Sequence, residues 1–448
     1  MQFCIFSETF DILNTNPDIV TNELSTDNKM MKVLFVSIAG PPKGSPESLQ
    51  VSKCLKYLIG HQLNIYLVTE KLPKVNFGWR TLETKYQAIL SQVTQVIKVP
   101  VYYHRYLHAV IRRLSHKILP RLDNEFLFTL ATRRILKDLM KKPDIIYSRS
   151  TPFSSAALAM KLKRKYGVPW IMHLSDPWVL SPFFYHKGSV LKYHQKMERD
   201  CFKNADKITF TSQEQIGVYK QVYPEYQSKF MWFPNVFDES EIFTNPPLFS
   251  PNMSFLHTGN FYGPGRSPDS LLWALERISN HYPKLLKNIS FLFTGYHEPS
   301  VDKLLKRFES IGVKHLGVLP LEEIYKLQRQ SSVLIIIDWQ LPKDQAMFLL
   351  SKTLDYLAAR KPIIAITTSG STLYKLIQGV YGQCFDHHDI EGIKKHIVSL
   401  IDGYRNNHST FLNPYEVNME YSAGYQAKRL FELMTETAKM NVKVPPDE

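Results

Sequence analysis

Short apolar runs alternate with amphipathic stretches along most of the chain, which is the pattern of parallel α/β units. In the first half, the predicted strands cover residues 32–38, 63–69, 144–150, 169–175, 207–212 and 229–234. In the second half, they cover residues 254–260, 289–295, 314–319, 332–338 and 362–368. The chain ends in a long amphipathic pattern at 420–440 that predicts a helix.

A segment rich in proline and asparagine interrupts this alternation. Residues 234–252, PNVFDESEIFTNPPLFSPN, have no regular period and carry several turn formers. A chain of 448 residues is long enough for two large domains. We therefore expect a first domain at 30–234 with the C-terminal helix at about 419–440, a linker at 235–252 and a second domain at 253–418.

The first residues have the composition of a loose extension. Residues 1–28 contain Glu8, Asp11 and Asp18 but no basic residue, so they do not resemble a secretory signal. We expect an extension over 1–29 and a natural start at Met30 or Met31. No apolar run approaches the roughly 18 to 20 residues that span a bilayer, and the four widely spaced cysteines indicate a reducing compartment. These features predict a cytoplasmic protein, either free or peripheral on the inner face of the plasma membrane.

Positive charge is concentrated in one part of the first half. The chain carries a formal net charge of +14, which favours anionic partners. No acidic residue lies between Glu83 and Asp123, where apolar residues recur at helical spacing opposite the basic ones. The basic residues of this run include Lys98, Arg105, Arg112, Arg113, Lys117 and Arg121. Residues 98–121 predict either a helix on an anionic membrane or a solvated surface helix, and no nucleic-acid-binding fold accompanies them.

Candidate site residues follow the strands, because ligands of doubly wound sheets bind beyond the carboxyl ends of strands. After the strand at 32–38, Gly40 and Gly44 precede Ser45 and Pro46, which are typical of a helix cap and first turn. This loop either admits an anionic ligand to the free N–H groups of the helix or is only a tight turn. The spacing is not that of a dinucleotide-binding fingerprint.

A histidine and an aspartate follow the predicted strand at 169–175. His173 and Asp176 lie in the sequence HLSDPW, and either side chain can accept a proton or bind a sugar hydroxyl. Asp before Pro is also a common turn former. Both residues are therefore candidates for catalysis. The alternatives are a structural turn for Asp176 and a hydrogen-bonded polar residue at a strand end for His173.

Two loops of the second domain indicate a phosphate site. Gly259, Gly263 and Gly265 surround Arg266 before a predicted helix, where the planar guanidinium suits a diphosphate. The segment LLSKTLDYLAARKPIIAITTSGS, residues 349–371, groups a hydroxyl, a cation and a carboxylate at the start of a helix that we expect to begin near residue 348. Free N–H groups there would face a phosphate. The alternatives are a surface arginine and an ordinary amphipathic helix.

No metal or cofactor signature accompanies these loops. The sequence has no H-E-x-x-H, no Walker A motif and no G-x-S-x-G, and His387 with His388 forms an isolated pair. We expect a site that needs neither a metal ion nor a cofactor.

Taken together, these motifs resemble the retaining family-4 glycosyltransferases of the GT-B fold that build bacterial polysaccharides. SKTLDYLAARKPIIAI is similar to that family's S-K-L-x-E-Y-L-A-x-x-K-P-I-L-A segment, and HTGNFYGPGRSPDSLLWAL is similar to the start of its second domain. PDIIYSRSTPFSSAALAMKLKRKYGVPWIMHLSDPW resembles a stretch of one branch, while ADKITFTSQEQIGVY and FPNVFDESEIF resemble the family's strand and linker. The resemblance runs from about residue 32 to residue 433.

The resemblance implies a fold and an activity. The fold would be α/β, with two Rossmann-like doubly wound domains facing a central cleft and a C-terminal helix packing back on the first domain. The activity would be the transfer, with retention, of a sugar from a UDP- or GDP-type donor to a hydroxyl of a sugar or lipid-linked sugar acceptor. Surface polysaccharide or glycolipid synthesis would be the setting.

The resemblance also implies roles for individual residues. Arg266 and Lys352 would neutralise the donor diphosphate beside Ser351, and Asp355 would hold the ribose. Gly44 would line the donor phosphates and Gly295 the nucleotide pocket. Asp176 and His173 would face the acceptor and the transferred sugar.

The chain departs from the family pattern at several positions. Met347 stands where the first glutamate of the E-x7-E pair is expected, and Asp355 replaces the second. Val236 occupies a glycine position of the linker, and His173 stands where the nearest branch tends to have an acid. Two alternatives therefore stay open, a nucleotide-sugar 2-epimerase and a non-catalytic protein that binds nucleotide sugars.

Overall fold

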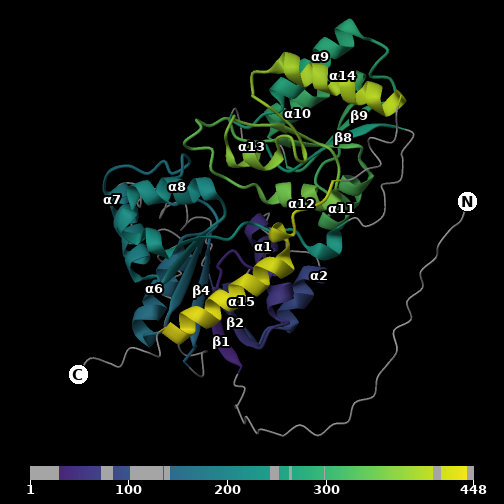
Figure 1. Cartoon of the computed structure of the whole chain (residues 1–448). Coiled ribbons are helices and arrows are strands. Elements are labelled where there is room, and N and C mark those ends of the chain that lie inside the picture. The colour runs from purple at the N-terminus through teal and green to yellow at the C-terminus, as the bar shows by residue number, and fades with distance from the viewer. Residues whose placement is uncertain are drawn as a thin grey trace, which may run out of the picture. The chain divides into compact units, whose positions relative to one another are not determined.

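The computed structural model describes residues 30–71, 84–100, 135, 142–242, 252–261, 265–296, 298–406 and 415–440. The predicted extension at 1–29, most of the basic run at 98–121, and Gly263 lie outside these ranges. Figure 1 shows the whole chain and labels its helices and strands. No helix of the described part is long and apolar enough to cross a membrane.

The first part of the chain forms a parallel seven-stranded sheet in the order β3-β2-β1-β4-β5-β6-β7. Its strands are β1 (Met31–Val36), β2 (Leu63–Lys71), β3 (Gln95–Pro100), β4 (Ile145–Ser150), β5 (Trp170–Leu174), β6 (Lys207–Phe210) and β7 (Phe230–Trp232). The helices with it are α1 (Pro46–Leu58), α2 (Thr84–Gln87), α6 (Ser154–Tyr166), α7 (Gly188–Asn204) and α8 (Gln213–Val222), and the 3-10 helices are η1 (Ala88–Ser91) and η2 (Pro224–Lys229). The strand order reverses between β1 and β4, so this sheet has the switch point at which doubly wound folds bind ligands.

The second part forms a parallel six-stranded sheet in the order β10-β9-β8-β11-β12-β13. Its strands are β8 (Ser254–Thr258), β9 (Ser290–Thr294), β10 (Val313–His315), β11 (Val333–Ile337), β12 (Ile363–Ile366) and β13 (Gly382–Phe385). The helices with it are α9 (Asp269–His281), α10 (Pro299–Lys306), α11 (Leu321–Gln330), α12 (Ser351–Ala359), α13 (Thr372–Ile377) and α14 (Ile390–Asn406), with η4 (Glu309–Ile311) among them. Here the order reverses between β8 and β11.

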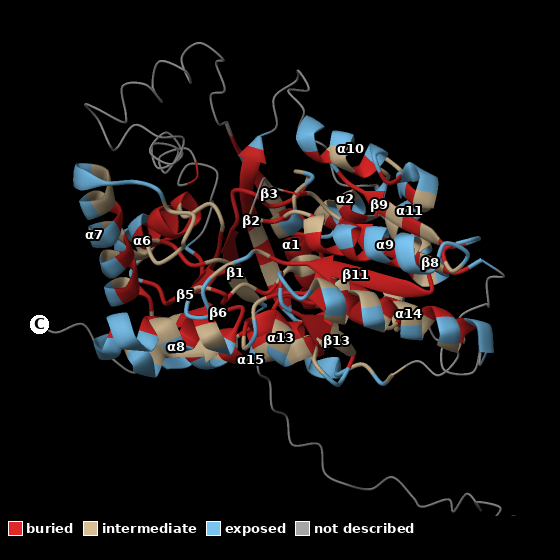
Figure 2. Ribbon diagram, turned by 90° about the horizontal axis from the view of Figure 1, so that it is seen from above, coloured by how far each residue is buried: buried red, intermediate tan, exposed pale blue. Residues whose placement is uncertain are grey.

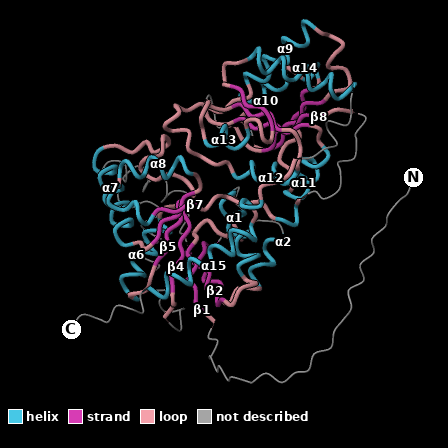
Figure 3. Tube along the Cα trace, viewed as in Figure 1, coloured by secondary structure: helices cyan, strands magenta, loops and turns pink. Residues whose placement is uncertain are grey.

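Each sheet is buried on both faces, as Figures 2 and 3 show together. In β1, Leu34 and Val36 join one apolar cluster while Val33 and Phe35 join another. Successive strand side chains point to opposite faces, so a strand covered by helices on both sides must be apolar throughout. This requirement explains the continuous apolar runs in the sequence.

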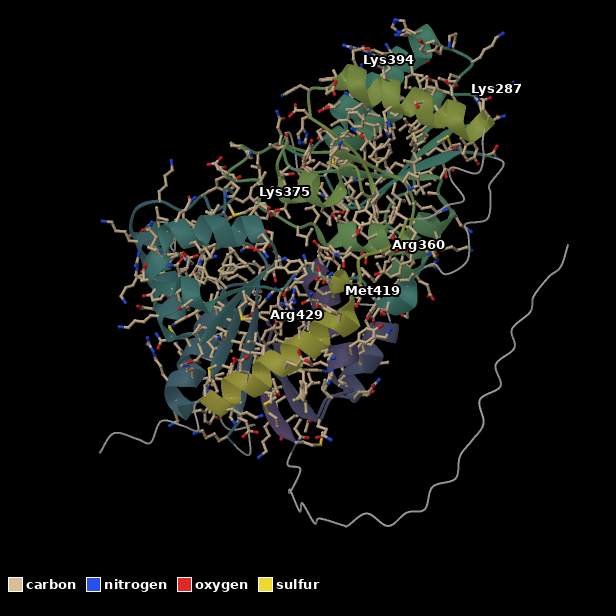
Figure 4. The ribbon with its side chains drawn as sticks, viewed as in Figure 1. Lys287, Arg360, Lys375, Lys394, Met419 and Arg429 are labelled. Carbon is tan, nitrogen blue, oxygen red and sulfur yellow. The ribbon has the colours of Figure 1, made fainter. Side chains whose placement is uncertain are left out.

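The C-terminal helix α15 (Ala423–Met440) packs on the first sheet's helix layer, as expected. Ala427, Leu430 and Met434 belong to the same apolar cluster as Leu55 and Leu58 of α1. Their spacing of three and four residues places them on one face of the helix. Arg429, labelled in Figure 4, lies over the ring of Phe233 at 4.6 Å.

The described part of the segment between the sheets contacts the chain that leads into α15. Residues 235–242 include the short helix η3 (Glu239–Glu241), and a second short helix, η6 (Met419–Tyr421), precedes α15. The Phe237 N–H donates to the Tyr421 carbonyl at 3.0 Å. A backbone hydrogen bond therefore connects the segment after β7 to the segment just before α15.

The predicted elements need four corrections. The strand predicted at 314–319 ends at His315 in β10 (Val313–His315), and Gly317 beyond it has a left-handed φ of +70°. β3 and β13 were absent from the predicted strands, because their sequences QVIKVP and GQCF are short and carry polar residues or glycine. Helix α12 begins at Ser351, three residues later than the expected start near Phe348, because Leu350 has extended dihedral angles (φ −63°, ψ 127°). Residues 348–350 therefore precede the helix and do not form its first turn.

Candidate functional site

One cavity of about 1630 Å³ collects loops from the carboxyl ends of both sheets. Of the residues to which the family resemblance gives a role, all but His173 line it, namely Gly44, Asp176, Arg266, Gly295, Ser351, Lys352 and Asp355. Ligand pockets of α/β proteins occur at such strand ends. The cavity is therefore the candidate site.

The start of α12 forms one wall of this cavity. Ser351 and Lys352 are the first two residues of the helix, and both line the cavity. The N–H groups of a first helical turn have no partner within the helix and carry partial positive charge. The wall is thus suited to an anion. Because α12 begins at Ser351, the backbone N–H groups of Ser351 and Lys352 belong to its first turn.

Lys352 is held beneath the loop that follows β8. Its Nζ donates to the Thr258 carbonyl at 2.8 Å and lies 3.3 Å from Nε2 of His257. Burial and the nearby charge of Arg266 lower its pKa well below the usual value for lysine. An anion that enters the cavity would therefore favour the protonated form of Lys352.

Two glycines permit this close packing. Gly259 has φ +119°, and a Cβ at that position would lie 2.9 Å from Nζ of Lys352. Gly295 has φ +137°, and a Cβ there would lie 2.5 Å from the Gly259 carbonyl oxygen. Both positions therefore favour glycine, Gly259 because of its positive φ and Gly295 also because a Cβ there would meet backbone atoms.

Arg266 is the second cation of this wall. Its side chain is buried, its Nε donates to the Ile337 carbonyl at 3.0 Å, and its guanidinium lies 5.9 Å from the centre of the Trp339 ring. Burial raises the pKa of the neighbouring Asp338, while the positive charge of Arg266 acts to lower it. Asp338 was not a predicted site residue, although it directly follows the apolar run of β11, where a carboxylate is conspicuous.

Asp355 lines the cavity one turn into α12 and forms an ion pair with α1, a helix of the first sheet. Its Oδ1 accepts from Nζ of Lys53 at 2.5 Å, and Lys53 is completely buried. Gln50, three residues earlier on α1, donates through Nε2 to Oγ of Ser351 at 2.8 Å. Neither residue was predicted, because α1 reads as an ordinary helix and its partners lie about 300 residues away.

The loops of the first sheet bring carboxylates into the cavity. Gly44 precedes Ser45, which caps α1 by accepting from the Ser48 N–H, as expected. Glu47 accepts from Nε of Arg149 at 2.7 Å and from Oγ of Ser175 at 2.8 Å. Lys43 and Glu70, which also line the cavity, form a further ion pair at 3.0 Å.

Asp176 lies beside this cluster. Burial and the charge of Glu47 raise its pKa to about 6, against the opposing effect of Arg149. A carboxyl group that titrates near neutral pH can hold or release a proton under ordinary conditions. Asp176 therefore has the position and the chemistry to contact a hydroxyl in the cavity.

His173 is not part of the cavity lining. It lies within β5 and is completely buried, with Nδ1 2.9 Å from Oγ1 of Thr209. Burial, and then Arg149, lowers its pKa well below the usual value. Its ring lies 6.4 Å from that of Tyr147, centre to centre, so its position is that of a neutral core residue on one face of the sheet.

Aromatic side chains lie near Arg266. Phe183 stands 4.5 Å from the ring of Trp339 and 5.5 Å from that of Phe348, centre to centre, and all three line the cavity.

Among the described residues, no group of three or more His, Cys, Asp or Glu side chains is placed to hold a metal ion.

Comparisons with known proteins agree with this architecture. Residues 94–241 match the model of Glycosyltransferase Family 4. Sucrose-phosphate synthase of Thermosynechococcus elongatus superposes with a TM-score of 0.64 at 12% identity, covering 92% of this chain and 100% of that one. HepE of Anabaena, in complex with UDP and glucose, gives 0.55 at 14% identity, covering 92% and 100%.

The lipopolysaccharide outer core galactosyltransferase WaaB gives a TM-score of 0.52 at 14% identity, covering 92% of this chain and 99% of that one. A search of curated protein sequences found no significant match. At these identities the structural likeness establishes the fold. The chain therefore has two Rossmann-like domains in the GT-B arrangement of glycosyltransferases, with a match to a glycosyltransferase family 4 domain over residues 94–241.

Proposed function

We propose that this protein transfers a glycosyl group from a nucleotide-diphospho sugar to a hydroxyl of an acceptor. The observation that carries the proposal is the convergence of Arg266, Lys352 and the start of α12 on one cavity. Two cations and a helix N-terminus together suit a diphosphate. The family-4 match and the glycosyltransferase neighbours support the same activity.

The cationic wall would act on the leaving group. Breaking the bond between the anomeric carbon and the diphosphate oxygen leaves negative charge on the diphosphate. Fixed donors aimed at developing charge typically lower a barrier by about 3 to 4 kcal/mol each. Arg266 and Lys352 would supply this stabilisation, while Ser351 and Asp355 would orient the diphosphate and the ribose. Gly295 would leave room for the nucleotide.

The acceptor would enter from the first sheet's side of the cavity. Asp176, with its pKa near 6, would bind the attacking hydroxyl. Gly44 would line the donor phosphates from that side. We propose retention of configuration on the basis of the family resemblance, and a polysaccharide or lipid-linked acceptor on the same basis. Contact with an anionic membrane through residues 98–121 would suit such an acceptor.

Non-catalytic binding of a nucleotide sugar is the second candidate. Met347, at the position where the family resemblance expects a glutamate, is buried, and its carbonyl accepts from Oγ of Ser212 at 2.6 Å. It therefore presents no carboxylate to a sugar. Under this candidate the cavity would bind the donor and leave it intact.

Mass spectrometry with a panel of nucleotide sugars tests the proposal. The purified protein is incubated with UDP-, GDP- and TDP-sugars, each with and without a mixture of glycan acceptors. A glycosylated acceptor together with a free nucleoside diphosphate is expected for one donor. Epimerised donor in the absence of acceptor would indicate an epimerase, and binding without any product would favour the non-catalytic candidate. Arg266→Ala should abolish transfer, so unaltered turnover would contradict the assignment.

A further inference from the structure

The segment that leads into α12 is held from the first sheet's side at alternate residues. The Met347 carbonyl accepts from Oγ of Ser212 at 2.6 Å, and the Leu349 carbonyl accepts from Nδ2 of Asn235 at 2.9 Å. Oγ of Ser351 then accepts from Nε2 of Gln50 at 2.8 Å. Ser212, Asn235 of the linker and Gln50 of α1 therefore hold residues 347, 349 and 351 from the first sheet's side.

Gln50 fixes the linker and α12 with one side chain. Its Oε1 accepts from the Val236 N–H at 2.7 Å, and its Nε2 donates to the Val236 carbonyl at 3.1 Å as well as to Ser351. Gln50 is buried, so these contacts are not shared with bulk water. A buried side-chain amide with its oxygen and nitrogen both engaged has one orientation, which fixes Ser351 relative to the linker.

Lys53 performs the same function one turn further along α1. Its Nζ donates to Oδ1 of Asp355 at 2.5 Å and to the Val236 carbonyl at 3.3 Å. The lysine side chain has no exposed surface, and that of Asp355 keeps 10%. A fully buried ammonium group is costly unless it is paired, so the pair resists separation. Asp355 is also one of the residues that line the cavity.

We propose that Gln50 and Lys53 of α1 are positioning residues for the donor, with Lys53 orienting the Asp355 carboxylate toward the ribose hydroxyls. This inference rests on the proposed function, because it assumes that a nucleoside diphosphate occupies the cavity. The donor site is then composite. Its ribose contact and most of its phosphate contacts come from α12 and the loop before α9, and their orientation comes from α1 and the linker.

A matched pair of ligands isolates this role. UDP and 2′,3′-dideoxy-UDP differ only in the ribose hydroxyls, so the ratio of their dissociation constants, measured by calorimetry, reports the ribose contact. We expect wild type to prefer UDP by about tenfold, as for a hydrogen bond to a charged group. Lys53→Met should bring the ratio close to one, as should Asp355→Asn, and the double variant should lose no more because the two residues act as a unit.

Lys56→Met is the matched control on the same helix. Nζ of Lys56 pairs with Asp238 of the linker at 2.7 Å and has no contact with α12. This variant removes a lysine from α1 and an ion pair to the linker, so it should keep the wild-type ratio. A Lys53→Met protein that also keeps the wild-type ratio would overturn the inference.

Two further outcomes are distinguishable. If wild type binds neither UDP nor GDP nor ADP, the proposed function fails, and the inference fails with it. If wild type binds but Lys53→Met does not fold by circular dichroism, Lys53→Gln carries the test, because it removes the charge and retains a polar group. A reduced ratio in Lys53→Gln supports the inference, and an unchanged ratio contradicts it.

Discussion

The side chain of Lys352 packs against the backbone of Gly259, which has a positive φ of +119°. The ammonium group of Lys352 lies where a side chain at position 259 would begin, 2.9 Å from the site of a Cβ. The adjacent Thr258 carbonyl accepts a hydrogen bond from the same Nζ at 2.8 Å. A side chain at position 259 would therefore force the Lys352 ammonium group to move.

Gly259→Ala should displace Lys352 and weaken nucleotide binding. The methyl group would clash with Nζ, and alanine is also disfavoured at φ +119°. We expect the UDP dissociation constant to rise at least about tenfold, the effect of losing one charge-assisted contact. Gly167→Ala is the control, because Gly167 also has a positive φ, +62°, but a Cβ there meets nothing within 4 Å. It should lose about 1 kcal/mol of stability and bind UDP as wild type does, and equal affinities in the two variants would contradict the role of Lys352.

Binding of the diphosphate should be accompanied by proton uptake. Burial and Arg266 lower the pKa of Lys352 in the empty site, and a bound dianion would raise it again. The bound state then carries more protons than the free state, so affinity should fall as pH rises. Calorimetry of UDP binding at pH 8 in two buffers of different ionisation enthalpy measures this uptake. Lys352→Met should remove it, and an equal uptake in that variant would assign the proton to another group.

The two sheets could be predicted from the sequence because their strands are buried on both faces. Runs such as VLIII of β11 are apolar without interruption, which local pattern detects directly. Gly382, the first residue of β13, shows the limit of this approach. A Cβ at Gly382 would meet the Ile363 carbonyl at 1.8 Å, so the strand begins with a residue that sequence patterns associate with turns.

The cavity residues of α12 and Arg266 could be predicted from the sequence, whereas the α1 residues that hold α12 could not. Ser351, Lys352 and Asp355 stand together on one helix start, and Arg266 follows a glycine loop, so each signal is local in sequence. Gln50 and Lys53 carry no such signal. Their importance depends on tertiary contacts with α12 and with the linker, and a single sequence contains no pattern for those contacts.

Asp176 should give transfer a pH dependence near neutrality. Burial and Glu47 raise its pKa to about 6, so the carboxylate form predominates only above that pH. If the carboxylate binds the attacking hydroxyl, kcat/KM for the acceptor should rise through pH 6 and level above pH 7. Asp176→Asn should lose this step and fall by about 100-fold, within the range for acid–base groups. The pH–rate profile of the two proteins is the measurement, and a step retained in the variant would exclude Asp176 as its source.

Glu198 should make the stability of the first sheet's helix layer depend on pH. This residue of α7 is completely buried and accepts from the hydroxyls of Tyr219 and Tyr223 at 2.8 Å and 2.7 Å. It also accepts from the Val179 N–H, in the segment that follows Asp176. Burial raises its pKa from 4.5 to about 7, against the effect of these hydrogen bonds.

The sign of the dependence follows from proton binding. Because the folded state holds the Glu198 proton more tightly than the unfolded state does, its contribution to stability is complete below pH 4.5 and is lost as pH rises through about 7. The loss is on the order of 3 kcal/mol. Glu198→Gln removes the titration, so the wild-type urea midpoint should fall relative to the variant between pH 5 and pH 8. Glu225→Gln, which alters an exposed carboxylate paired with Arg199, should follow wild type at both pH values. Parallel midpoints for wild type and Glu198→Gln would mean that this buried carboxyl does not titrate in the folded protein.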